Sequence, residues 1–143
     1  MSLHLRSEDV KRIREHGEAT FPHECCGLLL GRLLPAGKTV ERIEALRNER
    51  EESRHNRFLI APETLLKAER AARAGGLDIV GFYHSHPDHP ARPSEFDREH
   101  AWPTYSYVIV SVLAGAGDEV TSWTLAEDRS RFEAEEIVTA LEV

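Results

Sequence analysis

The sequence predicts an α/β fold: a single domain over residues 1–143, built on one mixed β-sheet with helices packed against it. Its 143 residues are the length of one ordinary domain, and 41% of them are hydrophobic, which is enough for a substantial core. Stretches with strand character alternate with stretches of helical periodicity, and no internal repeat or low-complexity linker divides the chain. One hydrophobic core is therefore expected.

The first expected element is a helix over residues 7–19. Ser7 can cap its first turn, which also carries two acidic residues that suit the positive end of the helix dipole. Pro22 marks the end of the helix. The side expected to face the core carries Val10, Ile13 and Gly17.

A β-hairpin is expected after this helix. Residues 25–34, with the sequence CCGLLLGRLL, are too continuously apolar for an exposed strand and too rich in glycine for a helix, so they predict a central strand. Residues 35–38 contain proline and glycine and predict a turn. Residues 39–46 alternate in polarity and predict the returning strand of the hairpin.

A loop, a short strand and a second helix should follow. Residues 48–56 are highly charged and predict a solvated loop, and residues 58–60 predict a short strand. The second helix is expected to begin near Pro62, because proline is tolerated in a first helical turn. It should end at the Gly75-Gly76 pair.

The rest of the chain predicts further strands. Residues 77–83 are short, apolar and rich in β-forming residues, and residues 104–113 carry the strongest strand pattern of the chain. Residues 119–125 alternate in polarity and predict another strand. The pattern of residues 132–141 fits either a strand or a short helix.

Charge and hydropathy exclude several classes of protein. The formal net charge of −7 argues against a uniformly basic surface for nucleic acid or anionic lipid, which needs excess lysine and arginine. No apolar run approaches the roughly 18 to 20 residues of a membrane span, and the first ten residues lack the pattern of a signal peptide. A cytoplasmic protein is expected.

Cys25 and Cys26 are the two cysteines of the chain. Adjacent α-carbons lie about 3.8 Å apart, short of the roughly 4.4–6.8 Å of ordinary disulfides, so the two residues predict no cross-link. Zinc fingers and zinc deaminases need cysteines separated by intervening residues, and this chain has none. Both thiols are expected to be buried as small hydrophobic groups.

Four of the eight histidines lie within residues 84–102. His84 and His86 are two residues apart, so in an extended segment their side chains leave the same face and can meet one metal ion. Residues 94–97 predict a helix start that folds back and brings Asp97 to the histidines. Two imidazoles and one carboxylate leave a fourth tetrahedral position open, which is typical of catalytic rather than structural zinc.

Simpler interpretations exist for each part of this pattern. His84 and His86 could be polar loop residues, since an isolated His-x-His occurs often by chance. Ser94 and Asp97 have the spacing of a capping box, which needs no metal. The capping and metal-binding interpretations are compatible, and a chance match to all four residues is expected on the order of once in a thousand.

The arrangement His84-Ser85-His86-Pro87, six residues, Ser94, two residues, Asp97 resembles the signature of the JAMM (MPN-plus) metalloproteases. The remaining element of that signature is an upstream glutamate, and Glu24 within residues 22–32 (PHECCGLLLGR) fills its place. The resemblance is to compact bacterial and archaeal members of the CysO-cysteine peptidase kind. It implies a JAMM/MPN-like α/β fold with a curved mixed sheet flanked by helices.

The resemblance also implies a mechanism. One zinc ion, held by the metal ligands His84, His86 and Asp97, would lower the pKa of its bound water toward about 7 and polarise the scissile carbonyl. Glu24 would accept the proton of the water and pass it to the leaving amine. Ser94 would donate a hydrogen bond to the oxyanion that develops on the attacked carbonyl.

The resemblance implies a zinc-dependent peptidase or isopeptidase that cleaves at the C-terminal diglycine tail of a ubiquitin-like or sulfur-carrier protein. A non-catalytic MPN scaffold is the alternative, since relatives without the metal ligands have that role. A third possibility, a role like that of RadC-type proteins, is disfavoured because those carry additional helical segments at the N-terminus.

Other residues near the motif have simpler interpretations. Asp88, His89 and His100 could bind metal by type, but the motif is complete without them, and a loop or a surface helix face accounts for them. Trp102 and Trp123 are expected to be packing residues. Ser85 could form a hydrogen bond near the metal, but the sequence assigns it no step.

Overall fold

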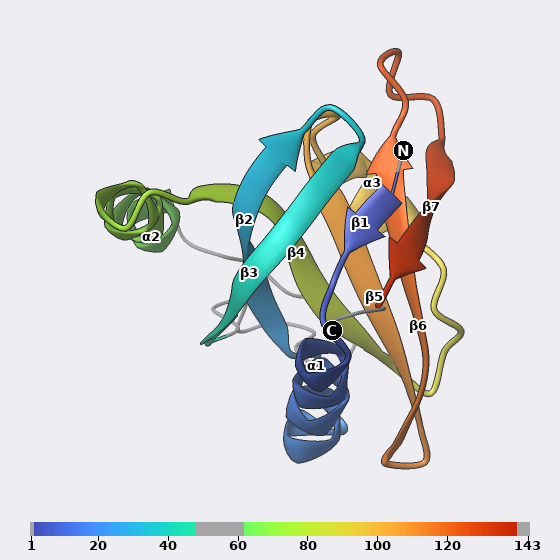
Figure 1. Cartoon of the computed structure of the whole chain (residues 1–143). Coiled ribbons are helices and arrows are strands. Elements are labelled where there is room, and N and C mark those ends of the chain that lie inside the picture. Colours follow the sequence, from blue (N-terminus) through green and yellow to red (C-terminus); the bar gives the residue numbers. More distant parts are fainter. Residues whose placement is uncertain (1, 48–61, 140–143) are drawn as a thin grey trace.

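A computed structural model describes residues 2–47 and 62–139 of the chain. The loop predicted over residues 48–56 and the short strand predicted over 58–60 lie outside the described residues. The elements, labelled in Figure 1, are β1 (Ser2–His4), α1 (Ser7–Thr20), β2 (Cys26–Leu34), β3 (Gly37–Leu46), α2 (Pro62–Ala74), β4 (Asp78–Pro87), α3 (Glu95–His100), β5 (Ser106–Leu113), β6 (Ala116–Leu125) and β7 (Phe132–Val138).

The strands form one mixed sheet that closes into a barrel in the order β1-β3-β2-β4-β5-β6-β7. β1 runs parallel to both β3 and β7, and β4 runs parallel to β5, while the other neighbouring pairs are antiparallel. The predicted α/β class with a curved mixed sheet is therefore confirmed. The curvature continues to closure because the three residues of β1 join β3 to β7.

The predicted hairpin forms at the centre of this sheet. β2 pairs with β3 on one side and with β4 on the other, so its apolar run is buried from Cys26 to Gly31. The turn is tighter than predicted, because β3 already begins at Gly37. The backbone of Gly37 has φ +147°, a conformation that favours glycine. A side chain at this position would also collide with the carbonyl oxygen of Ser2.

Helix α1 begins one residue earlier than its predicted cap implies. The N-cap is Arg6, no side chain caps the helix, and Ser7 is its first helical residue, so the prediction that Ser7 caps is wrong. The first turn is held instead by the Arg6 guanidinium, whose Nε lies 3.1 Å from Oδ2 of the buried Asp9. The predicted buried side is confirmed, and α1 lies across one end of the barrel (Figure 1).

The later elements also form where they were predicted, and one of them is longer than expected. α2 spans Pro62–Ala74 and ends at Gly75-Gly76, where Gly76 has φ +78°. The tail that fitted either a strand or a helix is the strand β7, because its backbone pairs with β6 and then with β1. β4 continues to Pro87, four residues beyond its predicted end, since it also pairs with β5 there.

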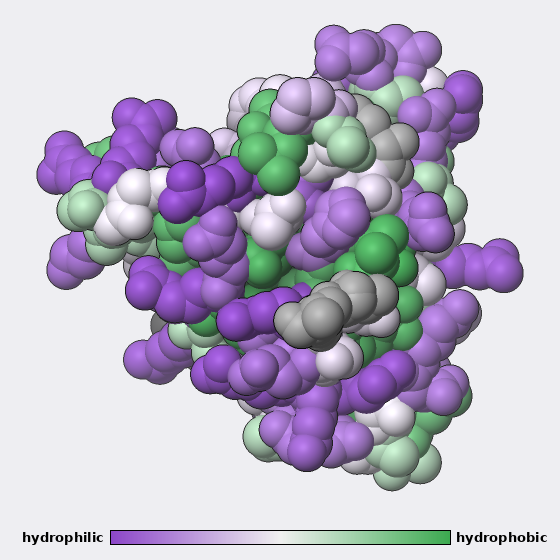
Figure 2. Space-filling model, viewed as in Figure 1, coloured by the Kyte–Doolittle hydropathy of each residue, from purple (hydrophilic) through white to green (hydrophobic). Residues whose placement is uncertain are grey.

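The surface agrees with the acidic composition. The face in Figure 2 is mostly hydrophilic, and its hydrophobic areas are small and separate, one of them near the end of β2. Leu33 and Leu34, at that end of β2, are the exposed leucines of the hairpin. Among the described residues, no helix combines the length and the apolar character needed to cross a membrane.

A buried polar chain links four strands inside the barrel. Lys38 of β3 donates from Nζ to Oγ of Ser106 at 2.8 Å, and the hydroxyls of Ser106 and Ser122 donate to Oε1 of Glu135 at 2.7 and 2.8 Å. Burial lowers the pKa of the Lys38 amine, while the charge of Glu135 opposes that shift. The sequence pattern does not predict this chain, because its members come from four separate segments.

We expect Gly31→Ala to lower the free energy of unfolding by about 3 kcal/mol, the upper end of the usual cost of overpacking. Gly31 lies where the β2–β3 register shifts, and a Cβ there would collide with the carbonyl oxygen of Thr39. Gly75→Ala is the matched control, because the nearest atom to its added Cβ would be 3.6 Å away. Urea unfolding of both variants tests this, and equal stabilities would contradict it.

Candidate metal centre

The C-terminal end of β4 carries His84 and His86 on one face of the sheet. The two side chains are buried, with exposed fractions of 1% and 7%. Their Nε2 atoms lie 3.2 Å apart, so both imidazoles point to one place. The predicted convergence follows from the two-residue period of a strand, which here includes both histidines.

Helix α3 brings Asp97 to the same place. Ser94 is the N-cap of α3, and its Oγ accepts a hydrogen bond from the backbone N–H of Asp97 at 3.1 Å. The backbone N–H of Ser94 in turn donates to Oδ2 of Asp97 at 2.8 Å. The predicted capping box is therefore confirmed, and it fixes the carboxylate 3.3 Å from Nε2 of His84 and 3.2 Å from Nε2 of His86.

The hydrogen bonds of His86 define which of its nitrogens faces this group. Nδ1 of His86 lies 3.0 Å from the carbonyl oxygen of Pro90, and because a carbonyl can only accept, Nδ1 carries the proton. In the neutral ring, Nε2 is then an acceptor that faces another acceptor, the carboxylate of Asp97. Such a set of facing acceptors is stabilised by a cation, and the three residues could hold a metal ion.

Burial and charge favour the protonation states that metal binding needs. Burial lowers the pKa of His84, so its imidazole is neutral at pH 7. Burial alone would raise the pKa of Asp97, but the closeness of His84 and His86, which favours a negative charge between them, holds it well below its usual range. Neutral imidazole and ionised carboxylate are the ligand forms of these side chains.

Glu24 lies at the end of the sheet that carries the two histidines. It is two residues before the first residue of β2 and is buried, with an exposed fraction of 4%. Cys26, two residues later, pairs with His84 in the β2–β4 ladder. The start of β2 and the histidine end of β4 therefore lie at the same end of the sheet.

The hydroxyl oxygen of Ser94 has a defined hydrogen-bond partner. Its oxygen already accepts a hydrogen bond from the backbone of Asp97, so the hydroxyl proton is available for donation elsewhere. Ser94 is exposed at the start of α3, next to the carboxylate that faces the two histidines. The hydroxyl of Ser94 thus lies at the accessible side of the group.

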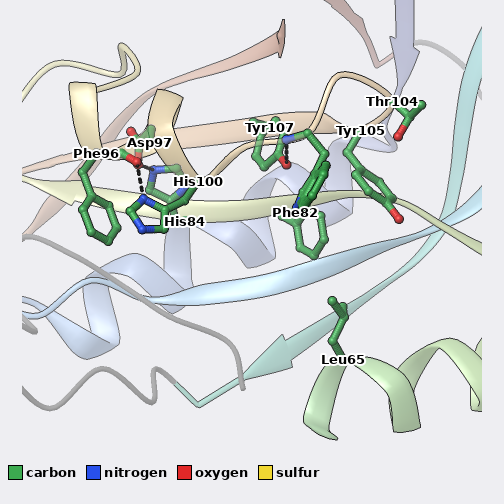
Figure 3. A pocket seen from close by; sticks show the side chains of 10 residues that line it. Leu65, Phe82, His84, Phe96, Asp97, His100, Thr104, Tyr105 and Tyr107 are labelled. Atoms are coloured by element: carbon green, nitrogen blue, oxygen red, sulfur yellow. Dashed lines mark hydrogen bonds and ion pairs between the residues drawn. The ribbon is translucent and has the colours of Figure 1, made fainter. Parts of the chain in front are cut away.

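A cavity of about 550 Å³ opens beside His84 and Asp97. Figure 3 shows His84, Asp97 and Phe96 at one end of it, the rings of Phe82 and Tyr105 at the other, and Leu65 of α2 facing them. Burial raises the pKa of Tyr107 to about 12, so this phenol is uncharged in the lining. The cavity combines an apolar wall with a polar end.

The aromatic lining was not predicted from the sequence. Trp102, expected to be a packing residue, is 62% exposed and lines the cavity, because the turn after α3 carries it to the surface beside Arg129. The packing prediction is therefore wrong for Trp102. One sequence signal for this lining was available: the two-residue period of β4 sets Phe82 on the same face as His84.

The remaining candidates do not join the group formed by His84, His86 and Asp97. Among the described residues, the potential metal-binding group contains only His84, His86 and Asp97, without Asp88, His89 or His100. Oδ1 of Asp88 instead accepts a hydrogen bond from the backbone of Ala114 at 2.7 Å. Cys25 and Cys26 are buried as predicted and form no disulfide, and burial raises the pKa of Cys25 to about 12.

Comparison with known proteins assigns the family. A family model described as prokaryotic homologs of the JAB domain matches residues 7–126, and the chain belongs to this family. A JAB1/MPN domain protein from Archaeoglobus fulgidus has the same fold, with a TM-score of 0.57 over 96% of this chain and 99% of that one at 19% identity. The resemblance to compact prokaryotic JAMM proteins is thus confirmed.

Two relatives carry functional names. A desampylase from Haloferax volcanii is 36% identical over 112 residues, which cover 78% of this chain and 78% of that protein. A probable TtuB-protein conjugate cleaving protease from Thermus thermophilus is 37% identical over 100 residues, which cover 70% of this chain and 64% of that protein.

We expect Asp97→Asn to weaken zinc binding by more than about a hundredfold. Loss of a residue that only hydrogen-bonds a metal ligand already costs up to about a hundredfold, and a direct ligand should cost more. The amide keeps an oxygen for the capping box but removes the charge between the imidazoles. Asp88→Asn is the control, because its amide oxygen can still accept from Ala114. Calorimetric titration measures both, and equal zinc affinities would exclude Asp97 as a ligand.

The metal-free protein should lose stability as the pH falls below about 6.5, the ordinary pKa of histidine. The unfolded chain then protonates position 84 while the folded chain does not, because burial lowers the pKa of His84. One such group contributes a slope of at most about 1.4 kcal/mol per pH unit. Urea unfolding between pH 7 and 5 should show a smaller slope for His84→Gln, and an unchanged slope for the exposed control His23→Gln.

Proposed function

We propose that this protein is a zinc-dependent peptidase or isopeptidase, acting as one JAMM-type catalytic domain. Its substrate is a ubiquitin-like or sulfur-carrier protein, and it hydrolyses an amide bond at the C-terminal diglycine tail of that protein. The observation that carries the proposal is the convergence of His84, His86 and Asp97 beside an accessible cavity. The relatives named as a desampylase and as a conjugate cleaving protease support the substrate class.

The spacing of the three ligands supports zinc. Tetrahedral zinc with ligand bonds of about 2.0–2.1 Å has neighbouring ligand atoms about 3.3 Å apart. The two Nε2 atoms lie 3.2 Å apart, close to this spacing, and the Asp97 carboxylate approaches both of them, with Oδ1 3.3 Å from His84 and Oδ2 3.2 Å from His86. A zinc ion bound there supplies activation of a water nucleophile and polarisation of the scissile carbonyl.

Glu24 acts as the general base. The β2–β4 pairing of Cys26 with His84, continued by two residues, would set Glu24 opposite His86. A buried carboxylate at that position takes a proton from the attacking water and then delivers it to the nitrogen of the leaving amine. No covalent bond to the protein forms in this scheme.

Ser94 stabilises the developing oxyanion. Its hydroxyl oxygen accepts from the backbone N–H of Asp97, which leaves the hydroxyl proton for donation to the oxyanion. One such donor is worth about 3–4 kcal/mol in the transition state. The capping box therefore both places Asp97 and holds the Ser94 hydroxyl.

The cavity receives the chain of the substrate next to the cleaved bond. Its apolar rings accept the side chains of an extended tail, and its polar end adjoins His84 and Asp97. In this proposal the two glycines lie beside the histidines and α3, where their lack of side chains lets the backbone come close. A preference for diglycine ends would follow.

The first experiment follows intact mass. We expect the zinc-loaded protein to remove an added cysteine or short peptide after the second glycine of a carrier protein, and a chelator to abolish the cleavage. A protein that holds zinc but leaves the mass of every diglycine-ended carrier unchanged would refute the substrate assignment. A protein that binds no zinc after reconstitution would instead favour a non-catalytic MPN scaffold.

We expect Glu24→Gln to lower kcat at least about a hundredfold, the usual contribution of a general base, because the amide cannot accept the proton. Zinc affinity should be retained, since Glu24 is not a ligand. Glu15→Gln, on the exposed side of α1, is the control and should cleave at the unchanged rate. Equal kcat for Glu24→Gln and the unaltered protein at full zinc loading would exclude this mechanism.

A further inference from the structure

Ser85 lies between the two histidines of the candidate site but on the opposite face of β4. It is fully buried inside the barrel, whereas His84 and His86 point to the outer face. Its Oγ accepts a hydrogen bond from the backbone N–H of Cys25 at 2.8 Å. Its own backbone N–H donates to the carbonyl oxygen of Cys25 at 3.2 Å.

These two bonds hold a residue that lies just outside the regular ladder. β2 begins at Cys26, whose pairing with His84 is the first of the β2–β4 ladder. Both polar groups of the Cys25 backbone are therefore tied to Ser85, one through a side chain and one through a peptide group. Glu24 is joined directly to the residue that is held in this way.

The side chain of Ser85 is confined from behind by α1. A Cβ added at Gly17 would come within 3.3 Å of Cβ of Ser85 and 2.9 Å of Cγ2 of Val112. The helix backbone thus packs directly against β4 and β5 at this point, which is possible because Gly17 has no side chain. The hydroxyl of Ser85 has little room to turn away from Cys25.

We propose that Ser85 is a positioning residue that holds Glu24 in register with His84 and His86. It touches neither substrate nor metal and acts through the backbone of Cys25. The proposal rests on the proposed function, in which Glu24 transfers the proton. Its consequence is that one strand, β4, sets the position of both the metal ligands and the general base.

Ser85→Ala is the main test, in the zinc-loaded protein with a diglycine-ended carrier as substrate. It removes the acceptor for the Cys25 N–H and leaves the imidazoles on the other face in place beside Pro90 and Asp97. We expect kcat to fall about 10- to 100-fold, as displacement of a catalytic group by about 1 Å does. KM and zinc affinity should stay within about twofold.

Two further variants separate the hydrogen bond from packing. Ser85→Thr keeps the hydroxyl and should retain most of the kcat. Ser85→Cys keeps a side chain of similar size, but its sulfur is a weaker acceptor, so its kcat should fall as expected for Ser85→Ala. It provides the same test if the alanine variant does not fold. Ser122→Ala removes a buried serine of the polar chain elsewhere in the barrel and should leave kcat unchanged.

Hydrogen exchange gives a readout that does not depend on catalysis. The amide of Cys25 should exchange about tenfold faster in metal-free Ser85→Ala than in the unaltered protein, because its acceptor is gone. Unchanged exchange, or unchanged kcat in both Ser85→Ala and Ser85→Cys, would overturn the proposal. So would a loss confined to KM or zinc affinity, or a folded Ser85→Thr as slow as Ser85→Ala.

The two proposals fail in different ways. If the unaltered zinc-loaded protein cleaves no carrier, the proposed function fails, and the exchange rate of Cys25 still reports whether Ser85 holds this backbone. If the unaltered protein cleaves and the variants match its kcat, the positioning role alone fails.

Discussion

The carboxylate of Asp97 is the group on which the candidate site depends. It closes the capping box of α3 through the backbone of Ser94 and at the same time faces the imidazoles of His84 and His86. Without the helix start, a strand would present two imidazoles and no third ligand. Without the imidazoles, the carboxylate would be an ordinary helix cap. The local hydrogen bonds of a helix end thereby set the geometry of a site that joins two segments of the chain.

The barrel gives this group a rigid base. β4 is paired on both sides, with β2 and β5, so the backbone that carries the histidines cannot shift without breaking two ladders. α1 closes one end of the barrel against β4 and β5, and the outer face of the same strands forms the wall of the aromatic cavity. Rigid strands and a short capped helix hold the side chains, which is the arrangement that precise chemistry requires.

Local pattern predicted most of the elements and the convergence of the three candidate metal ligands, because each depends on residues close in sequence. The strand period sets His84 and His86 on one face, and the spacing of Ser94 and Asp97 defines a cap. Contacts between segments that are distant in the sequence could not be predicted from such patterns. The closure of the barrel by a strand of three residues, the polar chain from Lys38 and the exposure of Trp102 depend on where other segments lie. No period within one segment contains that information.

The closing strand also determines the order in which the fold can be completed. Residues 2–4 pair with residues 37–39 and with residues 136–138, and the N–H of Leu5 donates to the carbonyl of Val138 at 3.0 Å. The two ends of the described chain therefore meet at one seam. On the ribosome, β1 and the β2–β3 hairpin emerge before β7, which is the second partner of β1. The barrel must remain open along this seam until β7 has emerged, so its interior is protected only after that point.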